Sequence, residues 1–234
     1  MQNKPHDTTI KKAFLNSVPV MAGYLVLGAA FGILLADKGY HFGWAILMSV
    51  FIYAGSMQFV TVNLLTGGAS LVSAAIMTLL VNARHIFYGI SMLTKYKNVG
   101  KAKPYLIFSL TDETFALVCN GAPADAKPGK YYFWVSFLDQ CYWIIGSVVG
   151  AVIGSAITFN TAGIDFAMTA LFVTIFTEQL LTTKDRFPAA MGIVCSIICL
   201  LIFGAESFLI PSMLSITVVL LLYGALRKER RADS

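Results

Sequence analysis

Long apolar runs separated by short polar stretches set the pattern of this chain. A membrane-spanning helix needs about 20 predominantly apolar residues, and the runs reach or approach that length. They show no apolar–polar alternation of the kind that marks a strand with one wet face. We therefore predict an all-α, polytopic membrane protein with seven or eight hydrophobic segments, near residues 17–36, 43–65, 70–93, 104–120, 131–157, 163–181, 188–204 and 208–226.

Composition supports this prediction and excludes a soluble protein. Of the 234 residues, 57% are hydrophobic and 12% are charged, and the mean hydropathy is +0.74. Soluble domains carry about 25% charged residues, so there is too little charge here to cover a water-facing surface. The polar stretches are too short for a separate soluble domain. We expect a single transmembrane domain over residues 1–234, with residues 1–16 and 227–234 as cytoplasmic tails.

Charge and cysteine placement exclude several other classes. The net charge of +5 comes from Lys and Arg near segment ends, where they indicate topology and contact with the lipid bilayer, not nucleic-acid binding. The four cysteines form no CxxC pair and accompany no histidine cluster, so we predict no metal and no other cofactor. Motifs for nucleotide binding, zinc proteases and serine hydrolases are absent from the sequence, and we do not expect an enzyme.

The distribution of lysines conflicts with eight full crossings. With cytoplasmic termini, the loop at residues 95–103, which holds four lysines, then falls on the outer side. Cytoplasmic loops are normally the ones enriched in Lys and Arg, so either the rule is overridden or one of the first three segments is broken or re-entrant. Gly55, Ser56 and Gln58 interrupt the middle of the second segment, which favours a break there, because broken helices are tolerated where they line a cavity.

The stretch VNARHIFYG (81–89) places Arg84 and His85 in an otherwise apolar segment. On a helix, Asn82, Arg84, His85 and Tyr88 span about 160° and form one polar face. In a bundle, such a face would pair the guanidinium with a carboxylate and present an imidazole that titrates near neutral pH. The spacing is equally compatible with an Arg84 that reaches lipid headgroups and a His85 that contacts a backbone carbonyl.

Carboxylates also occur inside apolar segments. Asp112 and Glu113 are adjacent in SLTDETFAL and diverge by about 100° on a helix, so both cannot face lipid. At least one faces a cavity or a basic partner such as Arg84. Asp139 lies about one third of the way into its segment, whereas Glu178 lies near a segment end, where an interfacial charge explains it as well as a role in transport. A buried carboxylate can carry a proton, and an ionised one can hold an ammonium group.

Around these residues the chain resembles the AzlC family of branched-chain amino acid exporters. The resemblance implies a bacterial inner-membrane protein that works with a small AzlD-type membrane subunit and exports valine, leucine, isoleucine and sometimes methionine. It implies no established set of catalytic residues. The stretches that carry it are GAAFGILLADKG (28–39), FIYAGSMQF (51–59), NARHIFYGISM (82–92) and LTDETFAL (110–117), continued by GSVVGAVIG (146–154) and DFAMTALFV (165–173).

The leading hypothesis is a secondary exporter of neutral branched-chain amino acids, coupled to protons. We expect the substrate carboxylate at Arg84 or at backbone N–H groups freed near a break, and the substrate ammonium at Asp112 or Asp139. The expected partners are the small subunit, the lipid bilayer and, in a higher oligomer, further copies of the chain. The predicted substrate-binding residues are Gly55, Ser56, Gln58, Asn82, Arg84, Asp112 and Asp139, and the predicted proton-coupling residues are His85, Glu113 and Glu178.

Two alternatives come from other classes of protein. A channel for ions or small solutes would not saturate with amino acid, and its flux would not respond to a proton uncoupler. A membrane-embedded enzyme acting on lipid would use Asp112 and Glu113 as acid and base, although the sequence offers neither a nucleophile nor a metal set for it.

Overall fold

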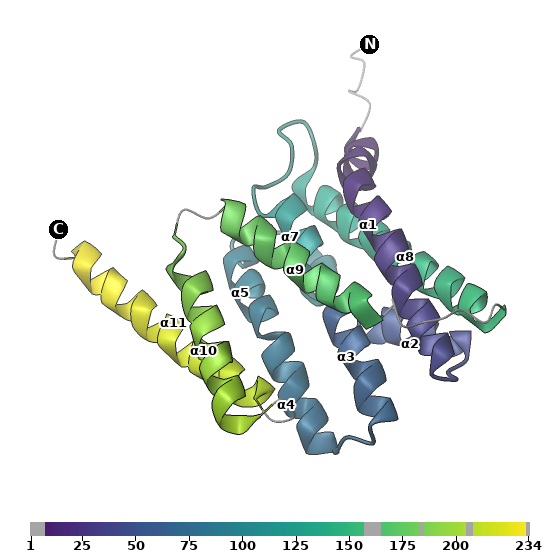
Figure 1. Cartoon of the computed structure of the whole chain (residues 1–234). Coiled ribbons are helices and arrows are strands. Elements are labelled where there is room, and N and C mark those ends of the chain that lie inside the picture. Colours follow the sequence, from purple (N-terminus) through teal and green to yellow (C-terminus); the bar gives the residue numbers. More distant parts are fainter. Residues whose placement is uncertain (1–7, 157–164, 183–184, 205–207, 233–234) are drawn as a thin grey trace, which may run out of the picture. The chain divides into compact units, whose positions relative to one another are not determined.

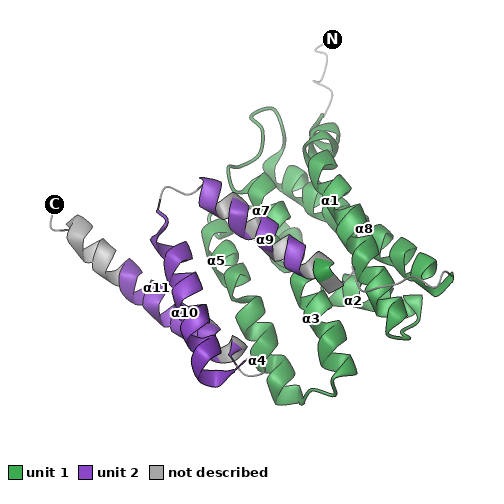
Figure 2. Cartoon of the chain, viewed as in Figure 1, with its two compact units in different colours: residues 1–168 green, residues 169–234 purple. Residues whose placement is uncertain are grey.

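The computed structural model describes residues 8–156, 165–182, 185–204 and 208–232, and throughout these ranges the regular structure is helical (Figure 1). The sequence predicted one transmembrane domain over residues 1–234. By their contacts, the residues group into two compact units (Figure 2). Unit 1 comprises Met1–Met168 and unit 2 comprises Thr169–Ser234.

Two 29-residue helices, α1 (Thr9–Asp37) and α8 (Pro128–Ala156), form the framework of unit 1. They lie side by side (Figure 1) because glycines remove side chains from their contact. A Cβ added to Gly32 would lie 2.1 Å from the backbone oxygen of Ser147, and one added to Gly150 would lie 2.1 Å from that of Ala29. The two backbones therefore touch, as small-residue faces allow in membrane helices.

Next to these two helices, α2 (Phe42–Phe51) and α3 (Gly55–Thr66) form a helical hairpin. Its tip contains Tyr53 with a φ of 40°, a left-handed value that is costly for any residue except glycine. From this tip α3 follows α1, because Phe59 packs edge-on against Phe31 with ring centroids 5.8 Å apart. Val62 then joins the same buried cluster as Leu34, near the end of α1. The hairpin thus returns to the end of unit 1 where α2 began.

A second hairpin enters unit 1 from the opposite end. It consists of η1 (Gly100–Ala102), α6 (Lys103–Phe108) and α7 (Asp112–Val118). Lys95, which precedes the hairpin, hydrogen-bonds to the carbonyl oxygen of Cys119, which follows it. The two hairpin tips approach each other in the middle of the unit, where the rings of Tyr53 and Phe108 have centroids 6.3 Å apart.

The connection between the two ends is made by α4 (Leu71–Val81) and α5 (Ala83–Met92). These helices bend by 44° at Asn82. Met92 and Tyr96 pack in a cluster with Ala13 near the start of α1 and Ala126 just before α8. The chain segment that follows α5 therefore lies at the end of unit 1 where α1 and α8 begin.

The sequence predicted an all-α protein with seven or eight hydrophobic segments and left open whether one of them is broken or re-entrant. Each predicted segment coincides with one helix or with two consecutive helices. Within the described ranges, however, the candidate membrane spans by length and composition are α1 and α8, with the bent pair α4–α5 as a third. The second and fourth segments are hairpins instead. The four-lysine loop lies at the same end of unit 1 as Lys12 and Lys127.

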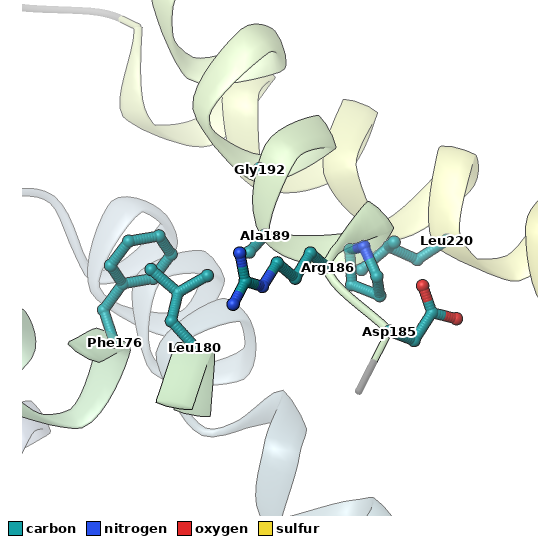
Figure 3. Close-up of a pocket in the computed structure, with 8 residues that line it drawn as sticks. Phe176, Leu180, Asp185, Arg186, Ala189, Gly192 and Leu220 are labelled. Atoms are coloured by element: carbon teal, nitrogen blue, oxygen red, sulfur yellow. The ribbon is translucent and has the colours of Figure 1, made fainter. Parts of the chain in front are cut away.

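Unit 2 contains α10 (Phe187–Phe203), α11 (Leu209–Ala232) and most of α9 (Asp165–Thr182). Asp185 joins the first two, because it accepts hydrogen bonds from Phe187 N at 3.1 Å and from the Tyr223 hydroxyl at 2.9 Å. The rings of Phe187 and Tyr223 stack with centroids 4.1 Å apart. A mainly apolar pocket of about 290 Å³ lies nearby (Figure 3), lined by Phe176, Leu180, Asp185, Arg186, Pro188, Ala189, Gly192 and Leu220.

Candidate functional site

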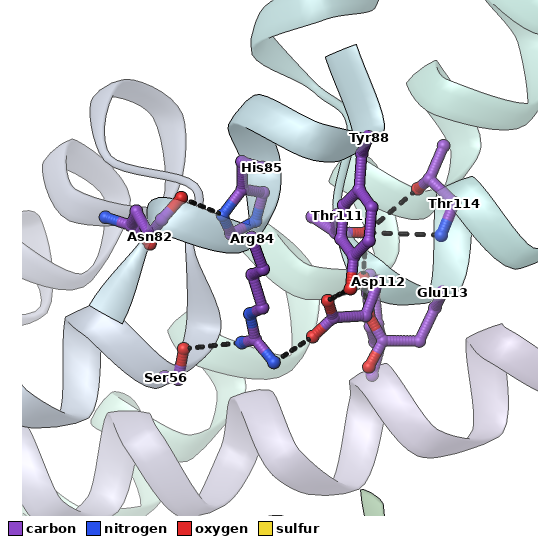
Figure 4. Close-up of polar contacts among 10 residues, drawn as sticks. Ser56, Asn82, Arg84, His85, Tyr88, Thr111, Asp112, Glu113 and Thr114 are labelled. Carbon is purple, nitrogen blue, oxygen red and sulfur yellow. Dashed lines mark hydrogen bonds and ion pairs between the residues drawn. The ribbon is translucent and has the colours of Figure 1, made fainter. Parts of the chain in front are cut away.

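The guanidinium of Arg84 joins the two hairpins of unit 1 (Figure 4). Arg84 Nη1 lies 2.7 Å from Asp112 Oδ2, and Nη2 donates to Ser56 Oγ at 2.9 Å. The other carboxylate oxygen of Asp112 accepts from the Tyr88 hydroxyl at 2.7 Å. The Arg84 and Asp112 side chains keep 28% and 21% of their surface exposed, so the protein covers the ion pair only in part.

Local sequence explains why these groups meet. Ser56 lies in the first turn of α3 and Asp112 in the first turn of α7, where backbone N–H groups have no partner within the helix and carry partial positive charge. The carboxylate of Asp112 is favourable at such a position and balances Arg84. Gly55 allows α3 to begin there, because an added Cβ would lie 2.9 Å from the indole ring of Trp143.

Two polar atoms at this site lack hydrogen-bond partners. Arg84 Nε and Asn82 Oδ1 are both buried and unbonded in the described structure. Buried polar groups in native proteins are normally satisfied, so these two atoms retain hydrogen-bonding capacity beside the ion pair. Asn82 otherwise serves as the bend between α4 and α5, where its backbone oxygen accepts from His85 N at 2.9 Å.

His85 follows the simpler of the two interpretations offered by the sequence. Its Nδ1 lies 3.2 Å from the backbone oxygen of Asn82, and its ring packs edge-on against Tyr88 with centroids 5.8 Å apart. The imidazole thus contacts a main-chain carbonyl, while its neighbour Arg84 forms the ion pair.

A chain of hydroxyl groups links Glu113 to Asp139. The Tyr24 hydroxyl oxygen lies 2.7 Å from Glu113 Oε2 and 2.6 Å from Thr111 Oγ1. Thr111 Oγ1 lies 3.1 Å from Thr114 Oγ1, which lies 2.8 Å from Asp139 Oδ2. Asp139 is 0% exposed, and its Oδ1 has no partner. Glu113 and Asp139 thus belong to one network, which borders the ion pair because Asp112 and Glu113 are adjacent.

Gln58 lies in a different environment from the other predicted substrate-binding residues. It is fully buried, with Nε2 donating to Ser49 Oγ at 3.2 Å and Oε1 accepting from Trp143 Nε1 at 2.8 Å. These bonds fix α2, α3 and α8 to one another. Gln58 and Gly55 therefore shape the site, while Ser56 and Arg84 present polar groups to it. The side chain of Glu178 lies outside the described part of the structure.

Several residues of the site were not singled out from the sequence. Thr111 had a usable signal, because a threonine followed directly by Asp and Glu is typical of a helix start, and its hydroxyl indeed accepts from Thr114 N at 3.2 Å. Tyr24 had none, since a tyrosine in an apolar segment looks like any other aromatic residue. Within the described ranges, no three His, Cys, Asp or Glu side chains come together as metal ligands.

Comparison with known proteins identifies relatives across most of the chain. The sequence model described as AzlC protein matches residues 19–157. The branched-chain amino acid transport protein AzlC of Bacillus subtilis is 44% identical over 211 residues, which cover 90% of this chain and 83% of that protein. An uncharacterized membrane protein of Helicobacter pylori is 44% identical over 214 residues, covering 91% and 94% of the two chains.

A more distant relative is the inner membrane protein YgaZ of Escherichia coli. It is 28% identical over 189 residues, covering 79% of this chain and 77% of that protein. No solved structure matches the chain significantly.

Proposed function

Because this chain belongs to the AzlC family, we propose that it is the large subunit of a two-component secondary exporter of branched-chain amino acids. Its substrates are valine, leucine and isoleucine, and methionine to a lesser extent, and its partner is a small AzlD-type membrane subunit. The chain is a multi-pass membrane protein, and we place it in the bacterial inner membrane. The name of the Bacillus subtilis relative, a branched-chain amino acid transport protein, supports the substrate class.

The observation that carries the proposal is the accessible Arg84–Asp112 ion pair between two hairpins. A zwitterionic amino acid carries the same two charges as this pair. Its carboxylate can take the place of Asp112 beside Arg84, and its ammonium can take the place of Arg84 beside Asp112. The exchange keeps every charge paired, so the substrate is bound without leaving an uncompensated charge in a low-dielectric site.

Neighbouring groups add to the recognition of the substrate carboxylate. The unbonded Arg84 Nε and the first backbone N–H groups of α3, near Gly55 and Ser56, are donors beside the pair. A half-helix N-terminus at this depth favours an anionic group, as in other transporters with broken helices. The ring of Phe115 stacks on that of Tyr88 with centroids 4.5 Å apart, and offers an apolar face for an aliphatic side chain.

The proposed orientation of the chain in the membrane rests on the distribution of its lysines. The end of unit 1 that holds the starts of α1 and α8 carries the loop 95–103 together with Lys12, Lys127 and Lys130, whereas Lys38 lies at the other end. Cytoplasmic segments are enriched in such residues. We therefore assign the lysine-rich end, with the N-terminus, to the cytoplasm. The C-terminal tail, with its four Lys and Arg residues at 227–231, is assigned to the same side.

Counterflow of labelled valine in proteoliposomes tests the function. Vesicles that contain both subunits should accumulate labelled valine in exchange for unlabelled leucine, with saturation. Arg84→Ala or Asp112→Asn should abolish this exchange, while assembly with the small subunit persists. Lys38→Ala is a matched control, since it removes an ion pair of similar exposure (Lys38–Asp37, 33% and 29%) outside the site.

The same vesicles separate the proposal from its alternatives. Full exchange in both site variants would contradict the assignment of Arg84 and Asp112 to substrate binding. Valine flux that does not saturate and ignores a proton uncoupler would indicate a channel instead of a coupled exporter.

A further inference from the structure

The hydroxyl network of unit 1 has more contacts than hydroxyl hydrogens. Four oxygen–oxygen contacts of 2.6–3.1 Å join five groups in the order Glu113, Tyr24, Thr111, Thr114 and Asp139. Three of the contacts, at 2.6–2.8 Å, are within the usual O–H···O range, and the fourth, between Thr111 Oγ1 and Thr114 Oγ1, is longer at 3.1 Å. As hydrogen bonds, the four contacts need four hydrogens. The three hydroxyl groups supply three. The backbone N–H of Thr114, which donates to Thr111 Oγ1 at 3.2 Å, does not enter any of the four contacts.

We propose that Glu113 and Asp139 share a single carboxyl proton, which provides the fourth hydrogen, and that the three hydroxyls relay this proton between them. If both carboxyl groups were ionised, one contact would join two oxygens without a hydrogen, and the unscreened lone pairs would repel each other. The shared proton rests on these contacts and on the burial of Asp139, and does not depend on the proposed function. Its use as the coupling proton of transport rests on the proposed function.

The relay has two equivalent arrangements. In one, Glu113 carries the proton and donates to Tyr24, Tyr24 donates to Thr111, Thr111 to Thr114, and Thr114 to ionised Asp139. In the other, Asp139 carries the proton, and every donor–acceptor relation along the chain is reversed. To pass from the first arrangement to the second, Glu113 and each of the three hydroxyls give up one hydrogen to the next oxygen in the chain. One O–H bond breaks at each donor, and one forms at each of the four acceptors, ending with Asp139. Atoms and charge balance, and no other reactant is needed.

The surroundings of Asp139 explain why a proton belongs there. Asp139 is fully buried on α8. One of its oxygens lies 2.8 Å from the Thr114 hydroxyl, and within the described residues the other has no hydrogen-bond partner. In the described part of unit 1, the cation at this depth is Arg84, which is held by Asp112 and Ser56. A buried carboxylate without a cation is strongly disfavoured. The titratable groups that act on Asp139 from neighbouring elements are Glu113 of α7, Tyr53 in the first hairpin tip, Tyr105 of α6 and Tyr24 of α1.

The Glu113 end of the network faces the substrate site. Glu113 is half-buried in the first turn of α7, directly after Asp112, and the groups acting on it are Tyr24, Asp112 and Arg84. Binding of a zwitterion at the Arg84–Asp112 pair changes the charge arrangement beside Glu113 but leaves buried Asp139 unaltered. The substrate ammonium is therefore assigned to Asp112, and Asp139, which the sequence had offered as an alternative partner for that ammonium, is assigned to the proton.

Infrared spectroscopy of the purified full-length protein at neutral pH tests the shared proton without any transport. A free carboxyl group has a pKa of about 4 and is ionised there, so the carbonyl band of a protonated carboxyl group reports this network. We expect one such band in the wild type and its loss in both Glu113→Gln and Asp139→Asn, because either amide supplies the fourth hydrogen through its own N–H. Absence of the band in the wild type overturns the proposal. A band that responds to only one substitution does so too, because it belongs to an isolated carboxyl group.

Transport variants test the relay. Thr114→Val removes the link next to Asp139 with little change in shape, and Thr114→Ser restores it. Proton-driven valine accumulation should fall about tenfold or more in the valine variant and recover in the serine variant. Ser136→Ala is the matched control, because Ser136 is a buried α8 residue one turn from Asp139 whose hydroxyl has no partner.

The infrared and transport experiments test the two proposals separately. If the wild type shows no valine exchange, the proposed transport function fails, and the infrared bands still decide whether the proton is shared. If exchange is present but Thr114→Val accumulates valine like the wild type, the relay is wrong while the exporter stands.

Discussion

Arg84 Nη1 lies 2.7 Å from Asp112 Oδ2, and this contact joins α5, just after the bend at Asn82, to α7, just after the tip of the second hairpin. Through Ser56 the same guanidinium also reaches the start of α3. One side chain thus holds three helix starts in the middle of unit 1. The pair is therefore a structural link that remains partly exposed.

Substitution of Arg84 by lysine should impair transport although the charge is kept. Lysine is a point charge, whereas the planar guanidinium binds Ser56 and Asp112 through two different nitrogens. We expect the initial rate of valine counterflow to fall about tenfold or more, since 1.4 kcal/mol of lost interaction corresponds to a factor of ten. Wild-type rates in Arg84→Lys would show that charge alone is sufficient.

Packing of α1 on α8 should tolerate no added methyl group at the central glycines. Gly32→Ala places a Cβ against the Ser147 backbone, which cannot rotate away, so the variant should lose about 1–3 kcal/mol of stability, or more. Thermal unfolding in detergent measures this loss. Gly23→Ala is the control on the same helix, because nothing lies within 4 Å of its added Cβ. Equal melting temperatures for the two variants would contradict the close approach of α1 and α8.

His85 and Glu113 should differ in their importance for coupling. Both were predicted to couple protons, but His85 contacts a main-chain oxygen while Glu113 belongs to the hydroxyl network. Glu113→Gln should therefore lower proton-driven valine accumulation about tenfold or more, whereas His85→Gln should lower it far less. Accumulation measured against an imposed pH gradient distinguishes them. A greater loss of valine accumulation in His85→Gln than in Glu113→Gln would instead assign proton coupling to the imidazole.

The loop before α8 should respond to acid through a single ion pair. The hydrogen bond from Lys12 lowers the pKa of Asp125, a fully exposed carboxyl group outside the membrane segments. Since the folded-state pKa lies below the unfolded value of about 3.9, the pair contributes its stability above that value and loses it as the pH falls through the lowered pKa. Unfolding of the wild type and Asp125→Asn should differ slightly at neutral pH and converge in acid. A constant difference down to the lowest pH would exclude this pair as its cause.

Single cysteines introduced into a cysteine-free background can report the two hairpins. Residues 101 and 125 should react with a membrane-impermeant thiol reagent from the same side, because both lie at the end of unit 1 where α1 and α8 begin. A cysteine at residue 68, between α3 and α4, should react from the opposite side. Labelling of residues 101 and 125 from opposite sides would mean that α6 and α7 cross the membrane.

Parts of the site could be found from sequence because charge in an apolar segment is conspicuous. Arg84, Asp112, Glu113 and Asp139 stand out for this reason, and the structure brings the first two into contact. The interrupted second segment was also foreseeable, since Gly55 and Ser56 are poor residues for a continuous membrane helix. Glu178 could be named by the same reasoning, but its side chain lies outside the described residues.

By itself, the sequence determined that the chain is helical, membrane-embedded and supplied with a few buried charges, because run length and composition govern whether a segment enters lipid. Only the tertiary structure decided which runs form one long helix and which form a hairpin, since α2–α3 and a long single helix contain apolar runs of similar length. The tertiary structure also decided the partners. Tyr24 and Asp139 belong to one network because glycine contacts bring α1 against α8, and contacts between residues so distant in the chain leave no local pattern in the sequence.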